Sequence, residues 1–134
     1  MRQFTKPMGL AVGPVGPVAR AGPVGPGNLA LATRDAITLF ANAPLLARDL
    51  MPEQPDRYDA LYLPRATYHT GDLNVHDLSF GTDGLWLVNS RFSCLSALSK
   101  DFSFVPRWRP PFISEVVPED RCHLNGLAVV DGRP

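Results

Sequence analysis

The sequence has little of what marks several common classes of protein. It holds only two cysteines, Cys94 and Cys122, too few for a disulfide framework, so we expect two buried free thiols and a cytoplasmic location. Its 13 basic and 13 acidic residues give no net charge, which argues against nucleic-acid binding. No apolar run is long enough for a membrane span. Glycine and proline interrupt the apolar residues after Met1–Lys6, which argues against a secretory signal.

What the sequence does contain is one pattern in two copies. Val75–Asn89 reads as a strand, an Asp-Gly turn at Asp83-Gly84, and a second strand. The pattern returns in His123–Gly132, where the Asp-Gly pair lies 48 residues further on, at position 131 instead of 83. A repeat of roughly 40 to 50 residues with a hairpin in each unit is typical of a β-propeller blade.

We therefore predict an all-β domain over residues 1–134, a partial β-propeller of about two blades and the start of a third. Such a chain is either an N-terminal piece of a longer propeller or one of several copies that close a ring. The chain reaches Asp131–Pro134 inside the predicted hairpin turn, which leaves the strand Gly126–Val130 without a return strand. An unpaired blade edge of this kind favours self-association.

The first blade is predicted from Met8–Val12, which matches Asn125–Val129 at four of five positions. Residues 13–27 form a low-complexity Gly-Pro-Val loop after this strand. Ala36–Phe40 fits either a strand or a short helix capped by Asp35, and the blade register favours the strand. The other elements predicted for this blade are a strand at Leu29–Thr33, a helical turn at Leu45–Leu50 and an outer strand at Tyr58–Leu63.

The second blade is predicted to follow a polar turn at His69–Asn74. Prolines after position 105 oppose ladder pairing, so the segment beyond it is predicted as a connection that packs Trp108 and Phe112 across the blade. The four strands predicted for this blade are Leu78–Phe80, Leu85–Asn89, Cys94–Leu98 and Phe102–Val105.

The sequence contains three long distinctive boxes, Asn89–Leu95, Trp108–Ile113 and Asp120–Ala128. Together with Lys6–Ala11 and Pro64-Arg65, they resemble a family of bacterial conserved hypothetical proteins, a domain of unknown function with a predicted β-propeller fold. The resemblance implies a propeller that continues beyond this chain, because family members are much longer, and it implies no activity.

The box Asn125–Ala128 is also similar to one in the six-bladed propellers of the senescence-marker-protein and gluconolactonase group. There the asparagine binds a metal, so this resemblance implies that Asn125 is a metal ligand.

The candidate ligand- or metal-binding residues lie where inner strands begin. Asp77 and Asn125 are at equivalent positions of the two copies, with His76 and His123 beside them, and Asn89 is a further candidate. Oxygen ligands of this kind suit a divalent cation such as Ca²⁺, although the cofactor stays open because calcium takes about six to eight ligands. The alternative is that Asp77 and Asn125 only bond backbone groups at the strand start.

Two readings that use the cysteines are less favoured. His76, His123, Cys122 and Cys94 lack the short spacing of a structural zinc site. Cys122 and His123 are adjacent, and on a strand adjacent side chains point to opposite faces, so they do not form a nucleophile and base pair. A buried structural thiol is the simpler interpretation.

A dense charged cluster is predicted around the third box. Guanidinium groups stack on tryptophan and pair with carboxylates, so the cluster is interpreted as a structural knot between blades, with an anion or carboxylate pocket as the alternative. The residues are Arg107, Trp108, Arg109, Asp120 and Arg121.

Three functions remain open at this stage. The first is a binding propeller, without catalysis established, that holds a small molecule or a protein partner at its channel. The second is a divalent-metal-dependent hydrolase of the lactonase type that uses Asn125, Asp77 and Asn89. The third is a truncated chain without a function of its own.

Overall fold

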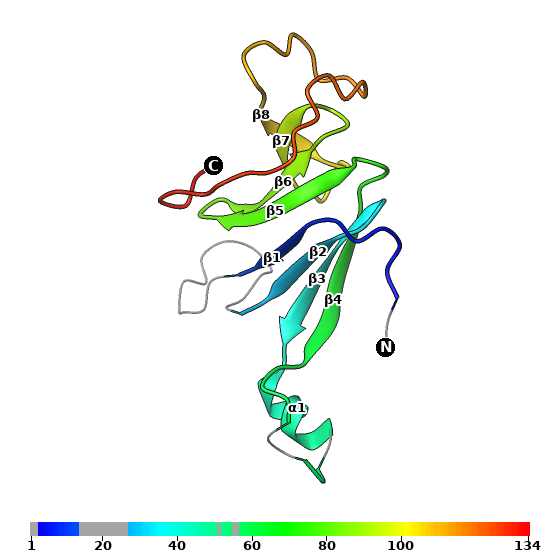
Figure 1. Ribbon diagram of the computed structural model, residues 1–134, viewed down its shortest axis with the longest axis vertical. Coiled ribbons are helices and arrows are strands. Elements are labelled where there is room, and N and C mark those ends of the chain that lie inside the picture. Colours follow the sequence, from blue (N-terminus) through cyan, green and yellow to red (C-terminus); the bar gives the residue numbers. More distant parts are fainter. Residues whose placement is uncertain (1–2, 14–26, 51, 55–56) are drawn as a thin grey trace.

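The computed structural model describes residues 3–13, 27–50, 52–54 and 57–134. They form two four-stranded antiparallel sheets, so the prediction of an all-β fold is confirmed. In each sheet the strands lie in chain order, and Figure 1 shows the two sheets against each other with β1 beside β5, not closed into a ring. The first sheet contains β1 (Leu10–Val12), β2 (Leu29–Ala32), β3 (Ala36–Asn42) and β4 (Tyr62–His69). The second contains β5 (Val75–Gly81), β6 (Gly84–Asn89), β7 (Cys94–Ala97) and β8 (Val105–Trp108).

The hairpin of β5 and β6 forms where the sequence predicts it. Gly81 pairs with Gly84 across a two-residue connection, and Gly84 has a φ of 110°. Glycine reaches positive φ without the steric penalty that other residues meet. Local turn chemistry therefore sets the register of this pair.

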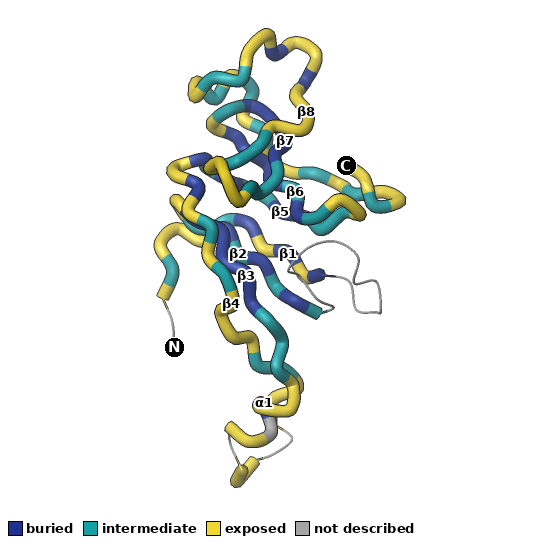
Figure 2. The backbone as a smooth tube through the Cα atoms, turned by 180° about the vertical axis from the view of Figure 1, so that it is seen from behind, coloured by how far each residue is buried: buried dark blue, intermediate teal, exposed yellow. Residues whose placement is uncertain are grey.

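The core lies between the two sheets, and Figure 2 shows buried residues gathered in the strands and exposed ones in α1 and the loops. Small residues let the sheets approach closely. A Cβ placed on Gly9 would lie 3.1 Å from Leu78 Cγ and 3.2 Å from the Asp77 backbone, so the segment before β1 packs directly on β5. The buried cluster comprises Ala11, Ala30, Ala32, Ile37, Leu39, Leu73, Val75, Leu78, Leu85 and Leu87.

Both outer strands differ from their predicted positions. The strand predicted at Tyr58–Leu63 is β4, which begins at Tyr62, and the one predicted at Phe102–Val105 is β8, which begins at Val105. The predictions failed because a proline within each strand was interpreted as a breaker.

Each of these prolines lies on an edge strand next to a register shift. Pro64 pairs with Phe40, and the shift leaves Arg65 as an extra residue in β4. Pro106 pairs with Ser96, and Arg107 is the extra residue in β8. Proline is tolerated at edges and bulges because its missing N–H leaves no ladder bond unmade there.

The predicted packing of Trp108 and Phe112 across the second sheet is wrong. Their exposed fractions are 49% and 75%. A turn in which the Ile113 N–H donates to the Pro110 carbonyl at 2.9 Å carries the chain away from β8. Ile113, which is 3% exposed, is the residue that this segment buries.

The one helix of the described residues is α1 (Pro44–Leu50), which leaves the first sheet between β3 and β4. It confirms the helical turn predicted at Leu45–Leu50. The alternative helix capped by Asp35 does not form, because β3 occupies its residues. Of the predicted Gly-Pro-Val loop, residues 14–26 lie outside the described residues.

The start of the third predicted blade does not form the expected inner strand over Gly126–Val130. Within the described residues this part of the chain has one isolated bridge, Val130 to Arg133, which closes the Asp131-Gly132 turn. The segment is held beside β5 instead by the Asp77 carboxylate, which accepts the Leu127 N–H at 3.2 Å. A side chain thus takes the place of a backbone ladder.

Candidate functional site

One end of both sheets collects strand beginnings and turns from distant parts of the chain. In an antiparallel meander the β2–β3 turn lies at the same end as the start of β1, and the β6–β7 turn lies at the same end as the start of β5. Asp120 joins this end because its N–H donates to the Arg91 carbonyl at 2.9 Å. We call this region the histidine end; it comprises residues 5–9, 33–35, 70–76, 90–93 and 120–124.

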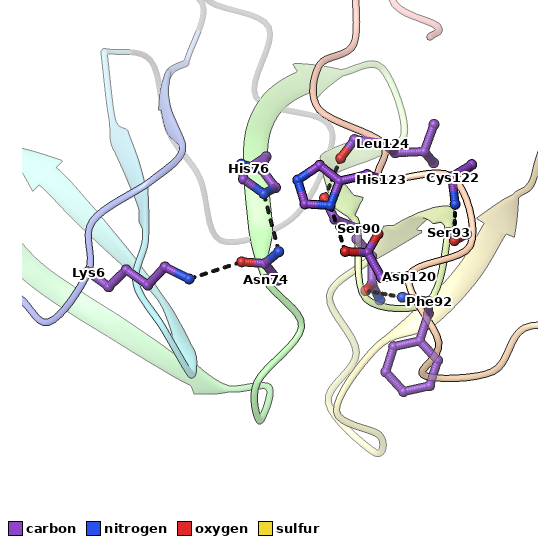
Figure 3. Close-up of polar contacts among 11 residues, drawn as sticks. Lys6, Asn74, His76, Ser90, Phe92, Ser93, Asp120, Cys122, His123 and Leu124 are labelled. Carbon is purple, nitrogen blue, oxygen red and sulfur yellow. Dashed lines mark hydrogen bonds and ion pairs between the residues drawn. The ribbon is translucent and has the colours of Figure 1, made fainter.

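Two histidines meet at this end, as Figure 3 shows. The rings of His76 and His123 pack edge to face, with centroids 4.9 Å apart and an interplanar angle of 63°. Lys6 Nζ donates to Asn74 Oδ1 at 3.2 Å, which directs Asn74 Nδ2 to His76 Nε2, also at 3.2 Å. Because lysine only donates, Asn74 Nδ2 is the donor to His76, and the neutral His76 ring carries its proton on Nδ1.

His123 is oriented from its other side. Its Nδ1–H donates to Asp120 Oδ2 at 2.6 Å, with the two side chains 53% and 35% exposed. A carboxylate at Nδ1 fixes the ring orientation and directs Nε2 toward whatever binds there. The second oxygen, Asp120 Oδ1, is buried without a hydrogen-bond partner in the described part of the chain.

Burial is the main cause that lowers the pKa of His76 below its ordinary value. The neighbouring His123 and Lys6 lower this pKa further because a second positive charge is unfavourable beside them, while Asp120 acts in the opposite direction. His76 is therefore neutral at neutral pH and presents an uncharged ring.

The backbone of the histidine end is unusual. Five of its non-glycine residues have left-handed conformations, with φ of 48° at Lys6, 53° at Asn74, 53° at Ser93, 49° at Asp120 and 46° at His123. Asparagine and aspartate accept this region more readily than lysine does. Backbone strain of about 1–3 kcal/mol per residue persists only where surrounding contacts hold the chain, and it is frequent at functional sites.

The contacts that hold the 120–124 segment come from the β6–β7 turn. Ser90 Oγ donates to the Leu124 carbonyl, and Ser93 Oγ accepts the Cys122 N–H at 3.3 Å. Ser90 and Ser93 are both buried. The position of His123 is thus set by the turn that follows β6.

Charged side chains surround the pair. Asp72 lies between two arginines, 4.0 Å from Arg34 and 3.7 Å from Arg91. All three are well exposed, so these ion pairs contribute little to stability. With Lys6, Arg121, Asp35 and Asp120 the histidine end contains four basic and three acidic side chains, so its charges nearly balance.

The predicted oxygen ligands occupy three different settings. Asp77 Oδ1 accepts the Leu78 N–H at 2.8 Å, and its Oδ2 accepts Leu127 N–H, so both carboxylate oxygens bond backbone groups. Asn89 is fully buried and accepts the Phe92 N–H at 3.2 Å. Asn125 is exposed.

The described residues include no group of three or more His, Cys, Asp or Glu side chains that could hold a metal ion. Cys94 and Cys122 are free thiols, but only Cys94 is buried as predicted, since Cys122 is partly exposed. Burial raises the pKa of Cys94 to about 11, so its thiol stays protonated at neutral pH and is a poor nucleophile.

The predicted charged cluster separates into different contacts. Arg121 pairs with Glu119 at 2.8 Å and donates to Ser114 Oγ at 3.1 Å. Arg109 donates to the Ser114 carbonyl. Asp120 turns to His123 at the histidine end, and Arg107 and Trp108 face a pocket described next.

A pocket of about 620 Å³ lies between the second sheet and the last residues of the chain. It is independent of the histidine pair. Its lining residues are Asp83, Trp86, Leu95, Arg107, Trp108, Leu124, Gly126, Leu127, Ala128, Arg133 and Pro134.

Over residues 1–134 the chain matches the model of a family described as a domain of unknown function, DUF4915. The chain belongs to this family. The expected membership in a domain-of-unknown-function family is thereby confirmed, while the propeller fold and the lactonase likeness remain predictions. Comparison with curated proteins and with solved structures found no match. In the described part of this DUF4915 chain no helix has the length and apolar character needed to cross a membrane.

Sequence reasoning found His76 and His123 but missed Lys6, Asn74 and the link to Asp120. Lys6 and Asn74 are 68 residues apart, and no local pattern joins them. One feature of the sequence indicated this contact. Lys6 precedes β1 and Asn74 precedes β5, which are the first strands of the two sheets.

Proposed function

We propose that this chain is the ligand-binding part of a β-propeller, and that it binds a polar small molecule at the histidine end. The observation that carries the proposal is that three segments, one from each copy of the repeat, bring side chains to one place. They contribute Lys6, Asn74 with His76, and Asp120 with His123. Groups gathered from distant segments at fixed orientation are typical of binding sites.

The order of the inner segments supports the propeller interpretation. Gly9 packs on Asp77, and Asp77 in turn bonds Leu127, so the three equivalent segments lie side by side. Each sheet is a four-stranded meander, which is the structure of a propeller blade. In this arrangement the histidine end forms part of the mouth of the central channel.

The available groups favour binding over catalysis. Ser90 and Ser93 use their hydroxyls to hold the 120–124 segment, and the Cys94 thiol is protonated. The histidine pair offers hydrogen-bond donors and acceptors, and Lys6 offers a positive charge. The two free thiols fit the cytoplasmic location that we infer from the sequence.

The metal-dependent hydrolase remains the alternative function. It requires Asp77 to exchange its two backbone amides for a cation that Asn125 and Asn89 also bind. Equilibrium dialysis against Ca²⁺ decides this: stoichiometric uptake that Asp77→Asn abolishes would favour the hydrolase, and no uptake would leave the binding function.

NMR of the histidine rings tests the proposed site. The chain has three histidines, and His69, on the exposed outer strand β4, serves as an internal reference. We expect at least one of citrate, inorganic phosphate and D-glucose to shift the His76 and His123 signals and leave His69 in place.

A matched pair of variants completes the test. His123→Gln should abolish the response, while His69→Gln should retain it. Equal shifts at all three histidines, or a response that survives His123→Gln, would count against a site at the histidine end. If a protein partner and none of the three compounds shifts the pair, the ligand is a macromolecule.

A further inference from the structure

The 620 Å³ pocket has one wall on the second sheet and the other on the end of the chain. Trp86 of β6, Leu95 of β7 and Trp108 of β8 line the first wall. The second wall comes from Leu124 and Gly126–Ala128, in the segment that Figure 1 shows returning past β6 and β5. The volume lies within the range of small-molecule sites, roughly 300 to 1,000 Å³.

The strand register explains why two tryptophans share this pocket. Trp86 pairs with Ala97, and Trp108 pairs with Leu95. Leu95 and Ala97 are two residues apart on β7 and therefore face the same side of the sheet. Both indole rings consequently lie on one face, whereas the core residue Leu87 points to the other.

The bulge in β8 adds an arginine to this aromatic surface. On a regular strand Arg107 and Trp108 would point to opposite faces. Arg107 is the extra residue of the register shift between Leu95 and Ser96, and a bulge redirects side chains in this way. Arg107 and Trp108 both line the pocket as a result.

The charges of the pocket favour an anion. Arg107 and Arg133 line it, and Asp83 is the one acidic side chain among the lining residues. Among the described residues, none of these three takes part in a salt bridge, so the guanidinium groups are available. Arginine binds carboxylates through two parallel N–H bonds and also stacks on flat rings.

We propose that this pocket binds a planar aromatic carboxylate. The ring lies against Trp86 and Trp108, and the carboxylate accepts hydrogen bonds from Arg107 and Arg133. This site shares only Leu124 with the histidine end and uses none of its polar side chains, so the proposal is tested independently of the function proposed above.

Trp86 and Trp108 are the two tryptophans of the chain, so fluorescence excited selectively in tryptophan reports on this pocket. We would titrate the full chain with naphthalene-2-carboxylate and with its neutral analogue 2-naphthalenemethanol, following fluorescence and heat. The carboxylate should bind saturably, and the alcohol about tenfold more weakly because it lacks the charge-assisted hydrogen bonds.

Two arginine variants distinguish binding in the pocket from nonspecific binding to the charged surface. Arg107→Gln should weaken carboxylate binding about tenfold. Arg109→Gln, two residues along the chain and bonded to Ser114 outside the pocket, should leave it unchanged. Equal affinity for acid and alcohol, or equal effects of the two variants, would overturn the proposal.

The other occupant to consider is a second copy of the chain. Light scattering of the wild type and of Trp108→Ala distinguishes this case. A monomer in both supports the small-molecule site. A dimer that Trp108→Ala dissociates would show that the pocket is an interface, which would also overturn the proposal.

Discussion

The two sheets have the same strand topology but differ in the residues that they bury and in the candidate sites that they line. Both are four-stranded meanders, and both end in an outer strand with a Pro-Arg bulge, at Pro64-Arg65 in the first and Pro106-Arg107 in the second. The first sheet buries small alanines and extends into α1. The second buries leucines, anchors the 120–124 segment and lines the aromatic pocket, and the segments that flank both sheets together form the histidine end. The repeated four-stranded sheet determines the architecture. The segments that pack against it, such as 120–124, determine where polar side chains come together.

The largest effect expected concerns the core that the two sheets share. Ile37 of the first sheet and Leu87 of the second are both fully buried. Ile37→Ala and Leu87→Ala should each lower the free energy of unfolding by about 2 to 5 kcal/mol, because truncation leaves a cavity. Urea unfolding followed by circular dichroism measures both. One shared transition is expected in each variant; two separate transitions would show that the sheets fold independently.

The next largest loss of stability is expected where the segment before β1 packs on β5. Gly9→Ala should destabilise the protein by about 1 to 3 kcal/mol, because its Cβ meets Leu78 and the Asp77 backbone at 3.1 and 3.2 Å. Gly126→Ala is the control, since its Cβ has ordinary contact at 3.7 Å with Asp77 Oδ2. Thermal denaturation compares the two. Equal stability of both variants would refute the close approach of β1 to β5.

The link from the second sheet to the histidine end is a hydrogen bond from Ser90. Ser90→Ala should cost about 1 kcal/mol or more, because the Leu124 carbonyl loses its donor. Ser96→Ala is the matched control: its hydroxyl is equally buried but has no partner among the described residues, so its loss should change stability little. Chemical denaturation distinguishes them. A larger effect at Ser96 would contradict the assigned role of Ser90.

The smallest effect is a dependence of stability on pH. Because the folded-state pKa of His76 lies below its ordinary value, the unfolded state binds more protons in the interval between the two values. Stability should therefore fall as the pH drops from above 6.5 through that interval. His76→Gln should flatten this dependence, measured by thermal unfolding at a series of pH values.

Lys6 contributes to the same pKa. Lys6→Gln should raise the pKa of His76 by removing a neighbouring positive charge, whereas Lys100→Gln, on an exposed loop, should not change it. An NMR titration of both variants gives the comparison. Identical titration curves would argue that Lys6 does not approach the histidine end.

Local sequence signals predicted much of the fold. The Asp83-Gly84 turn, β6, β7 and the strand character of Ala36–Phe40 follow from turn chemistry and apolar alternation, which act within a few residues. The outer strands were misplaced because proline reads as a breaker when the edge position and the bulge are unknown. Those features exist only once the neighbouring strand is in place.

The candidate site was predicted less completely. His76 and His123 follow from the offset of the repeat, which places them near the same strand start. Asp77 was proposed as a ligand, with backbone bonding as the alternative. Its Oδ1 accepts the Leu78 N–H at the strand start, and its Oδ2 accepts the Leu127 N–H in a segment 50 residues away, which the sequence did not predict. The contacts of Lys6 likewise depend on how the sheets pack, and no spacing in the sequence encodes them.

The most direct test of the account is whether His76 and His123 meet in solution. An NMR experiment on the wild-type chain should show a nuclear Overhauser effect between the two rings, whose centroids are 4.9 Å apart. The pKa of His76 should rise in His123→Gln, because the neighbouring histidine lowers it. Absence of the Overhauser effect together with an unchanged His76 titration would contradict the account.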